Sequence, residues 1–543
     1  MLRALAVALL LLPTSALAQR EGVLETGSPL SDLVRRQATA GRLPQGAGDA
    51  RPLAAGEARA FVDSLAADDL SALSRADREL VERYRSDTPA TLFGRPAPLG
   101  AYRDGISVAR VSGDGYAFEA APVLALAAGP AARTAGDGLA YRNTRGARAA
   151  GHLGRLYFET RATENQRVPL VFARDSIRAT APGLGFVKGL GDDGYDYLEA
   201  TGAVGYRDRF VDVRLARDRN DWGAGIGTLF LSAHSAAYDH LRIAAAAGPV
   251  RYTMAVARLT TPDRDPRGND TVLPSKYAAF HRFSVAFGRV QLDAFEAVVF
   301  HDDTLRGNRR GLELGYLNPV IFFRPVESEL GSGDNALLGA GISVRGRGVR
   351  SYLQVLLDEF RAAGFFDDVH TNKWGLLAGV HTVDLGLAGL EARAEYARMR
   401  PYLWGHRTES SAYVHYNDVL GHDAGPNADR ATLALRYRPD VRTTASLSVA
   451  RTRRGRDPEG VYVGADPRVS YITRRDDVAP TFVGVRQTAW DVQAVLSREL
   501  LPRLAVDLAA TLRTLDDAER GPTRNAALTV GLRWEIAALG LGE

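Results

Sequence analysis

The feature that most constrains the fold of this chain is a period of two in its apolar residues, found from residue 96 to the C-terminus. In residues 503–513, leucine, valine and alanine alternate with charged or small residues. The same pattern recurs in residues 211–216, 432–438, 490–497 and 528–536. Successive side chains point to opposite faces of a β-strand, so each stretch predicts a strand with one apolar face and one polar or small face.

The first 18 residues predict a cleavable signal peptide. Arg3 precedes a short apolar run, Pro13 breaks it, and Ala16-Leu17-Ala18 is a small-x-small cleavage pattern. A spanning helix needs about 20 apolar residues, which this run does not provide. No later segment reaches about 18 uninterrupted apolar residues. We therefore expect an exported chain whose mature form begins at Gln19; an N-terminal membrane anchor is the alternative.

A short helical segment is predicted between the signal and the strands, in residues 19–95. Phe61, Val62 and Leu65 recur at helical spacing, as do apolar residues between 70 and 84. Ser74 has the position of an N-terminal cap, and Gly41 that of a helix stop. Such short amphipathic helices bury little surface alone, so we expect them to pack on the larger body as a cap or plug. A regulatory role is the alternative.

Alternation by itself does not distinguish a soluble sandwich from a transmembrane barrel, because both have one apolar face. Three features of residues 96–543 favour the barrel: their length, large charged residues in mid-strand, and many glycines and alanines on the polar face. The predicted fold is all-β, a large transmembrane antiparallel β-barrel with a small N-terminal periplasmic helical segment. Its length fits about 16 to 18 strands. The last strand is expected to end near Trp534 or Ile536.

Composition and motifs exclude several classes of chemistry. The chain has no cysteine, which rules out disulfides, thiolate catalysis and cysteine-bound metals. Its net charge of +4 is too small to indicate nucleic-acid binding. No serine-hydrolase elbow, zinc-protease pair, phosphate-binding loop or complete calcium loop is present. Gly223, Gly225 and Gly227 lack dinucleotide-binding spacing, and we interpret them as strand glycines that ease packing. We predict no cofactor, no metal and no nucleic-acid partner.

Two stretches, residues 313–339 and 400–427, interrupt the alternation and combine aromatic rings with hydrogen-bonding groups. This mixture suits sugars, whose ring faces stack on aromatics while their hydroxyls need donors and acceptors. A folded-in loop that satisfies its own polar groups is the alternative. The candidate polysaccharide-binding or structural residues are Asn318, Arg324, Glu327, Asp334, Asn335, Asp358, Glu359, Tyr402, His415, Tyr416 and Asn417.

The first of these stretches also carries a structural prediction. Proline does not fit a central strand, so Asn318-Pro319 and Arg324-Pro325 indicate an ordered element of another kind. We expect it to fold into the barrel wall or lumen. There, Arg324 is expected to be held by Glu327, Asp334 or Asp358.

A basic segment follows one of the predicted strands. It contains Arg451, Arg453, Arg454 and Arg456, and we expect it to form an external loop or a strand end. Four arginines so close together repel one another unless counter-charges are near. They are either a solvated or lipid-headgroup-facing cluster, or they attract an anionic polysaccharide or lipopolysaccharide phosphate.

The dense stretches and their surroundings resemble the Wzi-type capsule-assembly proteins. The matching strings are Leu312–Pro319, Phe322–Glu327, Asp334–Gly339, Leu357–Phe360, Phe280–Phe283, Asp293–Val298, and His415–Asn417 with Gly421-His422. The resemblance implies an outer-membrane barrel of about 18 strands with a small periplasmic helical bundle. It also implies a lectin that holds capsular polysaccharide on the cell surface and is not an enzyme.

The function expected from the sequence is that of a non-enzymatic, lectin-like protein of the bacterial outer membrane. It would anchor or assemble capsular or other extracellular polysaccharide. An outer-membrane porin or specific channel is the first alternative. An outer-membrane hydrolase is the second, since a Ser/His or Asp/His pair can meet in space without being close in sequence. The expected partners are capsular polysaccharide or exopolysaccharide, outer-membrane lipid and lipopolysaccharide, and the barrel-assembly machinery, with the protein itself a monomer.

Overall fold

The computed structural model describes most of the chain. The described residues are 23–24, 27–85, 91–92, 95–96, 101–102, 105–171, 179–261, 273–301, 311–318, 322–330, 333–359, 367–474 and 476–536. The predicted signal peptide, residues 1–18, and the predicted mature N-terminus, Gln19, lie outside them.

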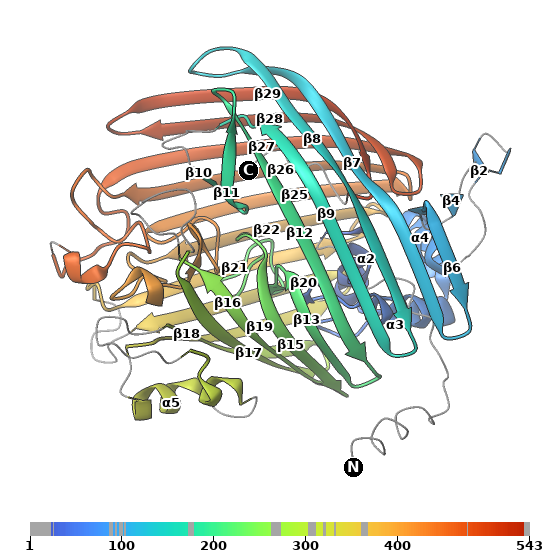
Figure 1. Cartoon of the computed structure of the whole chain (residues 1–543), viewed down its shortest axis with the longest axis horizontal. Helices are drawn as coiled ribbons and strands as arrows, with labels where there is room; N and C mark the ends of the chain where they lie inside the picture. The colour runs from blue at the N-terminus through green and yellow to red at the C-terminus, as the bar shows by residue number, and fades with distance from the viewer. Residues whose placement is uncertain are drawn as a thin grey trace.

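Eighteen antiparallel strands form a closed barrel, because the last strand pairs with the first as well as with its predecessor (Figure 1). The predicted fold class is confirmed, and the strand number is the upper end of the predicted range. The last strand ends at Trp534, as predicted. The barrel strands are β7 (Tyr116–Ala132), β8 (Gly138–Leu153), β9 (Leu156–Val168), β12 (Gly194–Arg207), β13 (Val211–Asp218), β15 (Tyr238–Ala247), β16 (Val250–Thr260), β17 (Ser275–Phe287), β18 (Val290–Phe300), β19 (Asn335–Gly346), β20 (Val349–Glu359), β21 (Lys373–Val383), β22 (Leu390–Met399), β25 (Ala428–Asp440), β26 (Thr443–Arg456), β27 (Val485–Leu501), β28 (Leu504–Asp517) and β29 (Gly521–Trp534).

The alternation in the sequence divides the side chains between the outer face and the lumen. Leu433, Leu508 and Leu528 are about half exposed on the outer face. Arg436, on the same strand as Leu433 but of opposite parity, points into the lumen and pairs with Asp32. Arg436 therefore faces the interior, as the sequence predicted for a polar lumen. The Arg145–Glu164 pair in the middle of β8 and β9 is an exception, because both side chains are about half exposed.

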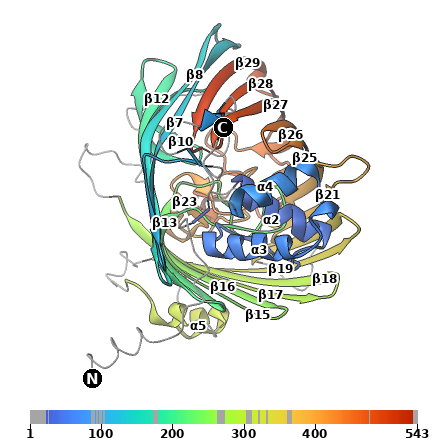
Figure 2. The same ribbon diagram turned by 90° about the vertical axis from the view of Figure 1, so that its right-hand side faces the viewer.

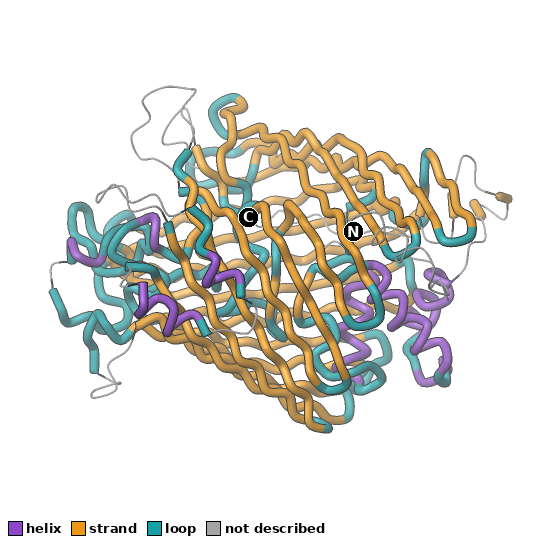
Figure 3. The backbone as a smooth tube through the Cα atoms, turned by 60° about the horizontal axis from the view of Figure 1, so that its bottom comes forward, coloured by secondary structure: helices purple, strands orange, loops and turns teal. Residues whose placement is uncertain are grey.

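The two rims of the barrel differ in the length of their connections. At one rim, here called the short-turn rim, neighbouring strands are joined by tight turns such as the one between β8 and β9. At the other, the long-loop rim, long segments join the strands, including residues 219–237, 400–427 and 457–484. Figure 3 shows the larger helices at one end of the barrel and long loops at the other.

Three helices lie at the short-turn rim (Figure 2): α2 (Pro29–Ala40), α3 (Ala55–Ala67) and α4 (Arg75–Arg85). Ser28 caps α2 and Gly41, at φ 86°, ends it. The Oγ atom of Ser74 accepts from the Asp77 N–H at the start of α4, as the predicted cap requires. The helices share one apolar cluster that includes Leu33, Val34, Val62, Leu65, Leu80, Val81 and Tyr84.

The lumen next to β16–β22 is filled by a large apolar core. It joins inward-facing residues of these strands, among them Phe280 and Phe295, to residues of the long loops, among them Phe230 and Tyr413. The rings of Phe230 and Phe295 stack at 4.8 Å between centroids. This core fixes the loops inside the barrel.

One long loop packs on the outside of the barrel. Within it, η3 (Leu314–Leu317) and α5 (Phe323–Leu330) cover outward-facing residues of β16, β17 and β18, including Val298 and Phe300. In Figure 2, α5 lies outside the wall below these strands. Phe323 packs on His281, with 4.1 Å between ring centroids, and its N–H donates to Oε1 of Glu296 at 2.9 Å. The prediction that this element folds into the barrel wall or lumen is therefore wrong: Tyr316 and Phe323 are buried against the outer face of the wall, and Phe322 is exposed.

Several short elements complete the described structure. β10 (Ala179–Ala181) and β11 (Gly185–Leu190) form a hairpin at the long-loop rim, and β6 (Ala109–Gly113) pairs with the start of β7. The remaining ones are η1 (Leu70–Ala72), β1 (Ala50–Arg51), β2 (Thr91–Leu92), β3 (Arg95–Pro96), β4 (Ala101–Tyr102), β5 (Gly105–Ile106), β14 (Asp221–Trp222), η4 (Glu409–Ser411), β23 (Val414–His415), β24 (Asp418–Val419) and η5 (Tyr471–Thr473). None of the helices in the described part of the chain combines the length and apolar character that crossing a bilayer requires.

Candidate functional site

The lumen is entered from both ends, and the two entering segments meet inside it. Residues 41–54, between α2 and α3, enter from the short-turn rim, and residues 219–237 enter from the long-loop rim. They pair through β1 and β14, with Ala50 opposite Trp222 and Arg51 opposite Asp221. The Arg51 and Asp221 side chains also form an ion pair. The two segments together act as a plug.

Ion pairs with the wall hold the N-terminal half of this plug. The Nη1 and Nη2 atoms of Arg350 donate to the Asp49 carboxylate, at 2.8 and 2.6 Å. Arg282 donates to the Asp49 carbonyl oxygen at 2.8 Å. Burial alone would raise the pKa of Asp49, but the charges of Arg350 and Arg282 offset burial and hold that pKa well below its ordinary value. Asp49 is therefore charged at neutral pH and its pairing is strong.

The glycines at 223, 225 and 227 belong to the other half of the plug and not to a strand, so the interpretation as strand glycines was wrong. Glu395 on β22 accepts from the N–H groups of Ile226 and Gly227 at 2.9 and 2.8 Å. A Cβ atom on Gly225 would lie 2.2 Å from Oε2 of Glu395. Glycine is needed because the backbone approaches the wall too closely for a side chain.

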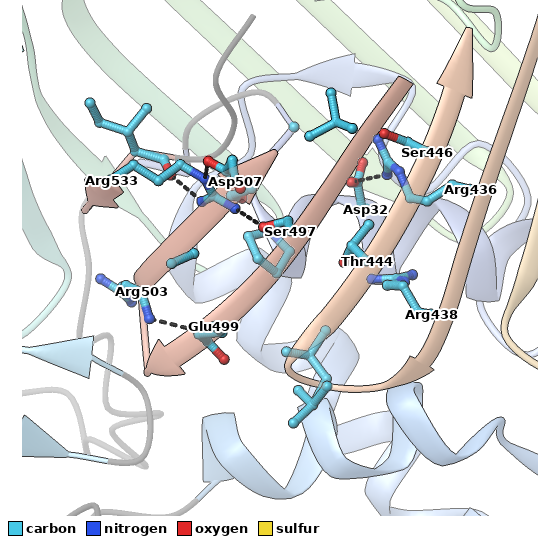
Figure 4. Close-up of a pocket in the computed structure, with 18 of the residues that line it drawn as sticks. Asp32, Arg436, Arg438, Thr444, Ser446, Ser497, Glu499, Arg503, Asp507 and Arg533 are labelled. Carbon is cyan, nitrogen blue, oxygen red and sulfur yellow. Dashed lines mark hydrogen bonds and ion pairs between the residues drawn. The ribbon is translucent and has the colours of Figure 1, made fainter. Parts of the chain in front are cut away.

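A cavity of about 460 Å³ remains in the lumen beside the plug (Figure 4). Strands β25–β29 form one wall, and α2 and α4 contribute to the other. Nine arginines and six carboxylates line it, together with serine and threonine hydroxyls. Arg533 is typical of these residues: it donates to Asp507 and to Ser497, both at 2.8 Å. The charged groups of the lining are largely paired with one another, and apolar side chains such as Leu80 and Val495 lie between them.

The long-loop rim carries an aromatic cluster at the point where three loops converge, and we call it the Tyr471 cluster. It comprises Tyr471 with His370, Lys373, His406 and Arg407. The Lys373 ammonium lies 4.4 Å from the Tyr471 ring centroid, and Arg407 donates to the Tyr471 hydroxyl at 3.2 Å. The rings of His370 and His406 lie 6.0 and 5.9 Å from that ring. Tyr471 is partly exposed, which places an aromatic ring among polar groups at the surface.

The histidines of the Tyr471 cluster are neutral. Burial, with Lys373 beside it, lowers the pKa of His406 to about 3. Burial and the charge of Arg474 also lower the pKa of His370. A neutral imidazole offers one donor and one acceptor. His406 is buried and faces Ser411 and Glu359, so among the two histidines only the partly exposed His370 lies at the surface.

Ser411, His406 and Glu359 form an arrangement that resembles a hydrolase triad. His406 Nδ1 lies 2.9 Å from Ser411 Oγ, and Nε2 lies 3.5 Å from Glu359. However, the Ser411 hydroxyl is buried, donates to the Thr408 carbonyl oxygen and accepts from the Thr408 N–H as part of a capping box. With its proton engaged there and His406 a weak base, Ser411 is a structural residue.

The structure divides the predicted binding residues among three places. Glu359 pairs with Lys373 at the Tyr471 cluster, and Tyr402 is buried nearby against Tyr462. Asp358 is structural, because its carboxylate accepts from the Trp404 N–H at 2.8 Å.

His415, Tyr416 and Asn417 lie apart from the Tyr471 cluster, on the β23–β24 turn. His415 is buried and its Nδ1 accepts from the Thr260 N–H at 3.0 Å. Tyr416 packs edge-on against Phe186 of the β11 hairpin, at 5.6 Å between ring centroids. The contacts of His415 and Tyr416 are those of a folded-in loop.

The remaining predicted residues of the first dense stretch belong to the outer-face element. Asp334 accepts from the Tyr316 hydroxyl at 2.8 Å and is buried, as is Asn335 at the start of β19, while Asn318 is exposed. The side chains of Arg324 and Glu327 lie outside the described residues, so the predicted Arg324 pairing stays a prediction.

Sequence reasoning missed Tyr471, His370, His406 and Arg407. His406 and Arg407 lie within the dense stretch 400–427 but were not chosen as candidates, and His370 and Tyr471 lie outside both stretches. No spacing in the sequence indicates that these residues are neighbours. Only the convergence of three loops brings them together. Within the described ranges, no group of three His, Asp or Glu side chains is arranged to hold a metal ion.

Comparison with known proteins defines the class of fold first. No family model matches the chain, and no curated protein matches its sequence. The solved structures that match are outer-membrane β-barrels. The chain is similar to OccK8 (OprE) of Pseudomonas aeruginosa, with a TM-score of 0.41, 8% identity, and coverage of 76% of this chain and 97% of that one.

The more extensive likeness is to Wzi of Escherichia coli, described as an outer-membrane protein involved in group 1 capsule assembly and a carbohydrate-binding β-barrel. The TM-score is 0.57 and the identity 11%, over 95% of this chain and 100% of that chain. The chain therefore has a Wzi-like fold.

Proposed function

We propose that this protein is a non-enzymatic β-barrel of the bacterial outer membrane that holds capsular or other extracellular polysaccharide at the cell surface. The observation that carries this proposal is the Tyr471 cluster, in which a partly exposed aromatic ring stands beside the exposed Arg407 on loops fixed over a plugged lumen. The apolar outer face of the barrel supports the location. The short-turn rim with its helices would face the periplasm and the long-loop rim the outside.

The location is tested by membrane fractionation of the producing cell. The protein should be recovered with outer-membrane markers, and unboiled and boiled samples should migrate differently on a gel. Recovery in the soluble periplasm would contradict the proposal.

The binding role is tested with purified protein and with the polysaccharide of the producing strain. Tyr471→Ala should weaken binding by about 0.5–1.5 kcal/mol, or roughly 2- to 12-fold, because stacking on the ring is lost. Tyr206→Ala is the matched control: Tyr206 is also partly exposed and also accepts from an arginine, Arg155 at 3.0 Å, but lies at the short-turn rim. Equal effects of the two substitutions would contradict a binding site at the long-loop rim.

The same role is tested in cells by deleting the gene and measuring cell-bound and released polysaccharide separately. The proposal expects less bound and more released polysaccharide, with the total unchanged. Shorter chains or free sugars in the wild type but not in the deletion strain would indicate an enzyme instead.

A channel for anionic solutes is the second candidate function, and the arginine-rich cavity is the observation that favours it. Carboxylates outside the lining reduce the net positive charge of its arginines, because Arg148 pairs with Glu119 and Arg438 with Asp77. Conductance in planar bilayers separates the two candidates. A plugged barrel should give no stable conductance, whereas steady anion-selective currents from the wild type would establish a channel.

A further inference from the structure

Strand parity divides the basic segment at the end of β26 into two pairs that face opposite sides of the wall. Arg451 and Arg453 share their parity with Val449, whose cross-strand partner Leu433 is exposed on the outer face. Arg454 and Arg456 have the opposite parity and point inward. Arg456 pairs there with Asp517 and Glu519, at 3.3 and 2.8 Å. The sequence cluster is therefore two separate sites.

The outward pair belongs to a larger basic and aromatic patch, here called the rim patch: Arg398, Arg451 and Arg453 with Phe482 and Trp490. The Arg453 and Arg398 guanidinium carbons lie 5.0 and 5.9 Å from the Phe482 ring centroid. The Arg451 guanidinium lies 5.7 Å from the Trp490 ring, which is 46% exposed on the outer face. The guanidinium groups of Arg398, Arg451 and Arg453 thus contact aromatic rings on the outside of the barrel.

The rim patch keeps a positive charge. Asp429 lies directly between Arg398 and Arg453 in the register of β22, β25 and β26. It accepts two hydrogen bonds from Arg453 and one, at 3.0 Å, from the Tyr396 hydroxyl, so one guanidinium is neutralised and oriented. Arg451 is exposed, and Arg453 is 44% exposed despite this pairing. The rim patch thus contains three arginine charges, and the Asp429 carboxylate compensates one of them.

The position of the rim patch indicates its ligand. Toward the barrel centre, the same outer face carries exposed apolar residues such as Leu433 and Leu496, which suit lipid chains. Arginines and a tryptophan just above such a band lie at the level of lipid headgroups. Guanidinium groups bind phosphate oxygens in a bidentate manner.

We propose that the rim patch binds the phosphorylated headgroup of an outer-leaflet lipid. Arg451 and Arg398 contact the phosphate, and Asp429 holds Arg453 beside them. The acyl chains lie along the apolar band below, so the ligand is a membrane lipid and not a soluble anion. This binding goes beyond the proposed function, because it concerns the outer wall and not the loops.

The test is native mass spectrometry of the folded protein in neutral detergent, titrated with bisphosphorylated lipid A. The triple variant Arg398→Gln, Arg451→Gln, Arg453→Gln should bind it roughly ten-fold more weakly, because several charge-assisted hydrogen bonds are lost. The double variant Arg454→Gln, Arg456→Gln removes inward arginines of the same segment and should bind as the wild type does. Dephosphorylated lipid A should bind weakly to all three proteins, and millimolar inorganic phosphate should not displace the lipid.

Equal binding of lipid A by the wild type and the triple variant would overturn the proposal. The proposal would also be overturned if the triple variant kept its affinity for lipid A but lost binding of soluble acidic polysaccharide. The rim patch would then be a polysaccharide-binding site. If the triple variant lacks the heat-modifiable folded band, it does not fold, and the single variant Arg451→Gln is measured in its place. Arg451 is exposed, so its substitution leaves the wall intact, and an unchanged lipid affinity of this variant would also contradict the proposal.

Discussion

The wall formed by β16–β18 and the wall formed by β25–β29 use the same strand geometry but bury their two faces differently. In the first, Phe280 and Phe295 join the apolar lumenal core, and Val298 and Phe300 are covered outside by η3 and α5. In the second, the inner face lines the cavity with its paired charges, and the apolar residues of the outer face are exposed.

The difference can be seen in the sequences of the strands. In β17, the four successive residues 277–280, Tyr-Ala-Ala-Phe, are apolar and face alternately outward and inward, whereas in β28 the apolar residues from Leu504 to Leu512 alternate with charged or small ones. A strand that is buried on both sides needs apolar residues at successive positions. A nearly continuous apolar run within a barrel therefore indicates a wall covered from inside and outside. The expected stability effects follow from this contrast.

The largest effect is expected for Phe230→Ala on the packed side. Phe230 is fully buried and stacks on Phe295, so its truncation opens a cavity that lipid does not reach. We expect a loss of about 3–5 kcal/mol in the free energy of unfolding, measured by urea titration in lipid vesicles. The control is Leu508→Ala on the other wall, which is 45% exposed and where lipid chains fill the space. Equal losses for Phe230→Ala and Leu508→Ala would contradict the proposed difference between the two walls.

Arg350→Ala should have the next largest effect. It leaves the Asp49 carboxylate buried without its bidentate partner, and removing one member of a buried pair costs roughly 3 kcal/mol or more. Arg350→Lys keeps the charge but not the two parallel bonds, so its loss should be smaller. If the plug loosens as expected, the alanine variant should also gain conductance in planar bilayers. A stable and non-conducting Arg350→Ala protein would show that this pair does not hold the plug.

Arg533→Ala tests the equivalent type of pair on the cavity side. Asp507 is as buried as Asp49, but Arg533 lines the cavity and is 14% exposed, against 5% for Arg350, so water can take the place of the removed guanidinium. We expect a loss of about 1–3 kcal/mol, clearly below that for Arg350→Ala in the same urea titration. If Arg533→Ala lowers the free energy of unfolding as much as Arg350→Ala does, water does not reach the Arg533–Asp507 pair from the cavity.

Mild acidification should have the smallest effect. The folded-state pKa of Asp49 is depressed, so its contribution is fully present above the unfolded pKa near 3.9 and is lost only as pH falls through the lower folded value. The temperature at which the folded gel band disappears should therefore be unchanged by this group between pH 7 and about pH 5. The assigned pairing would be contradicted if that temperature fell in the wild type between pH 7 and about pH 5 but not in the Asp49→Asn variant.

The sequence determined the class of fold, the division into short helices and a large barrel, and the end of the last strand. These follow from local rules: period two against a longer helical period, a serine before a helix, a glycine after one. The alternation also predicted a polar lumenal face with charged residues in mid-strand, such as Arg436. It did so because pleated geometry leaves each side chain only two directions.

Tertiary structure alone decided which surface each irregular segment covers. Residues 314–330 and the loop around Tyr413 have similar aromatic compositions, yet one packs outside the wall and the other inside. Tyr471 gains its neighbours from two other loops, and Gly225 is required only because Glu395 stands opposite. The four arginines of residues 451–456 look like one cluster in sequence but are separated by the barrel wall. The physical reason is that local sequence fixes the direction of a side chain relative to its own strand, whereas long-range contacts decide what lies in that direction.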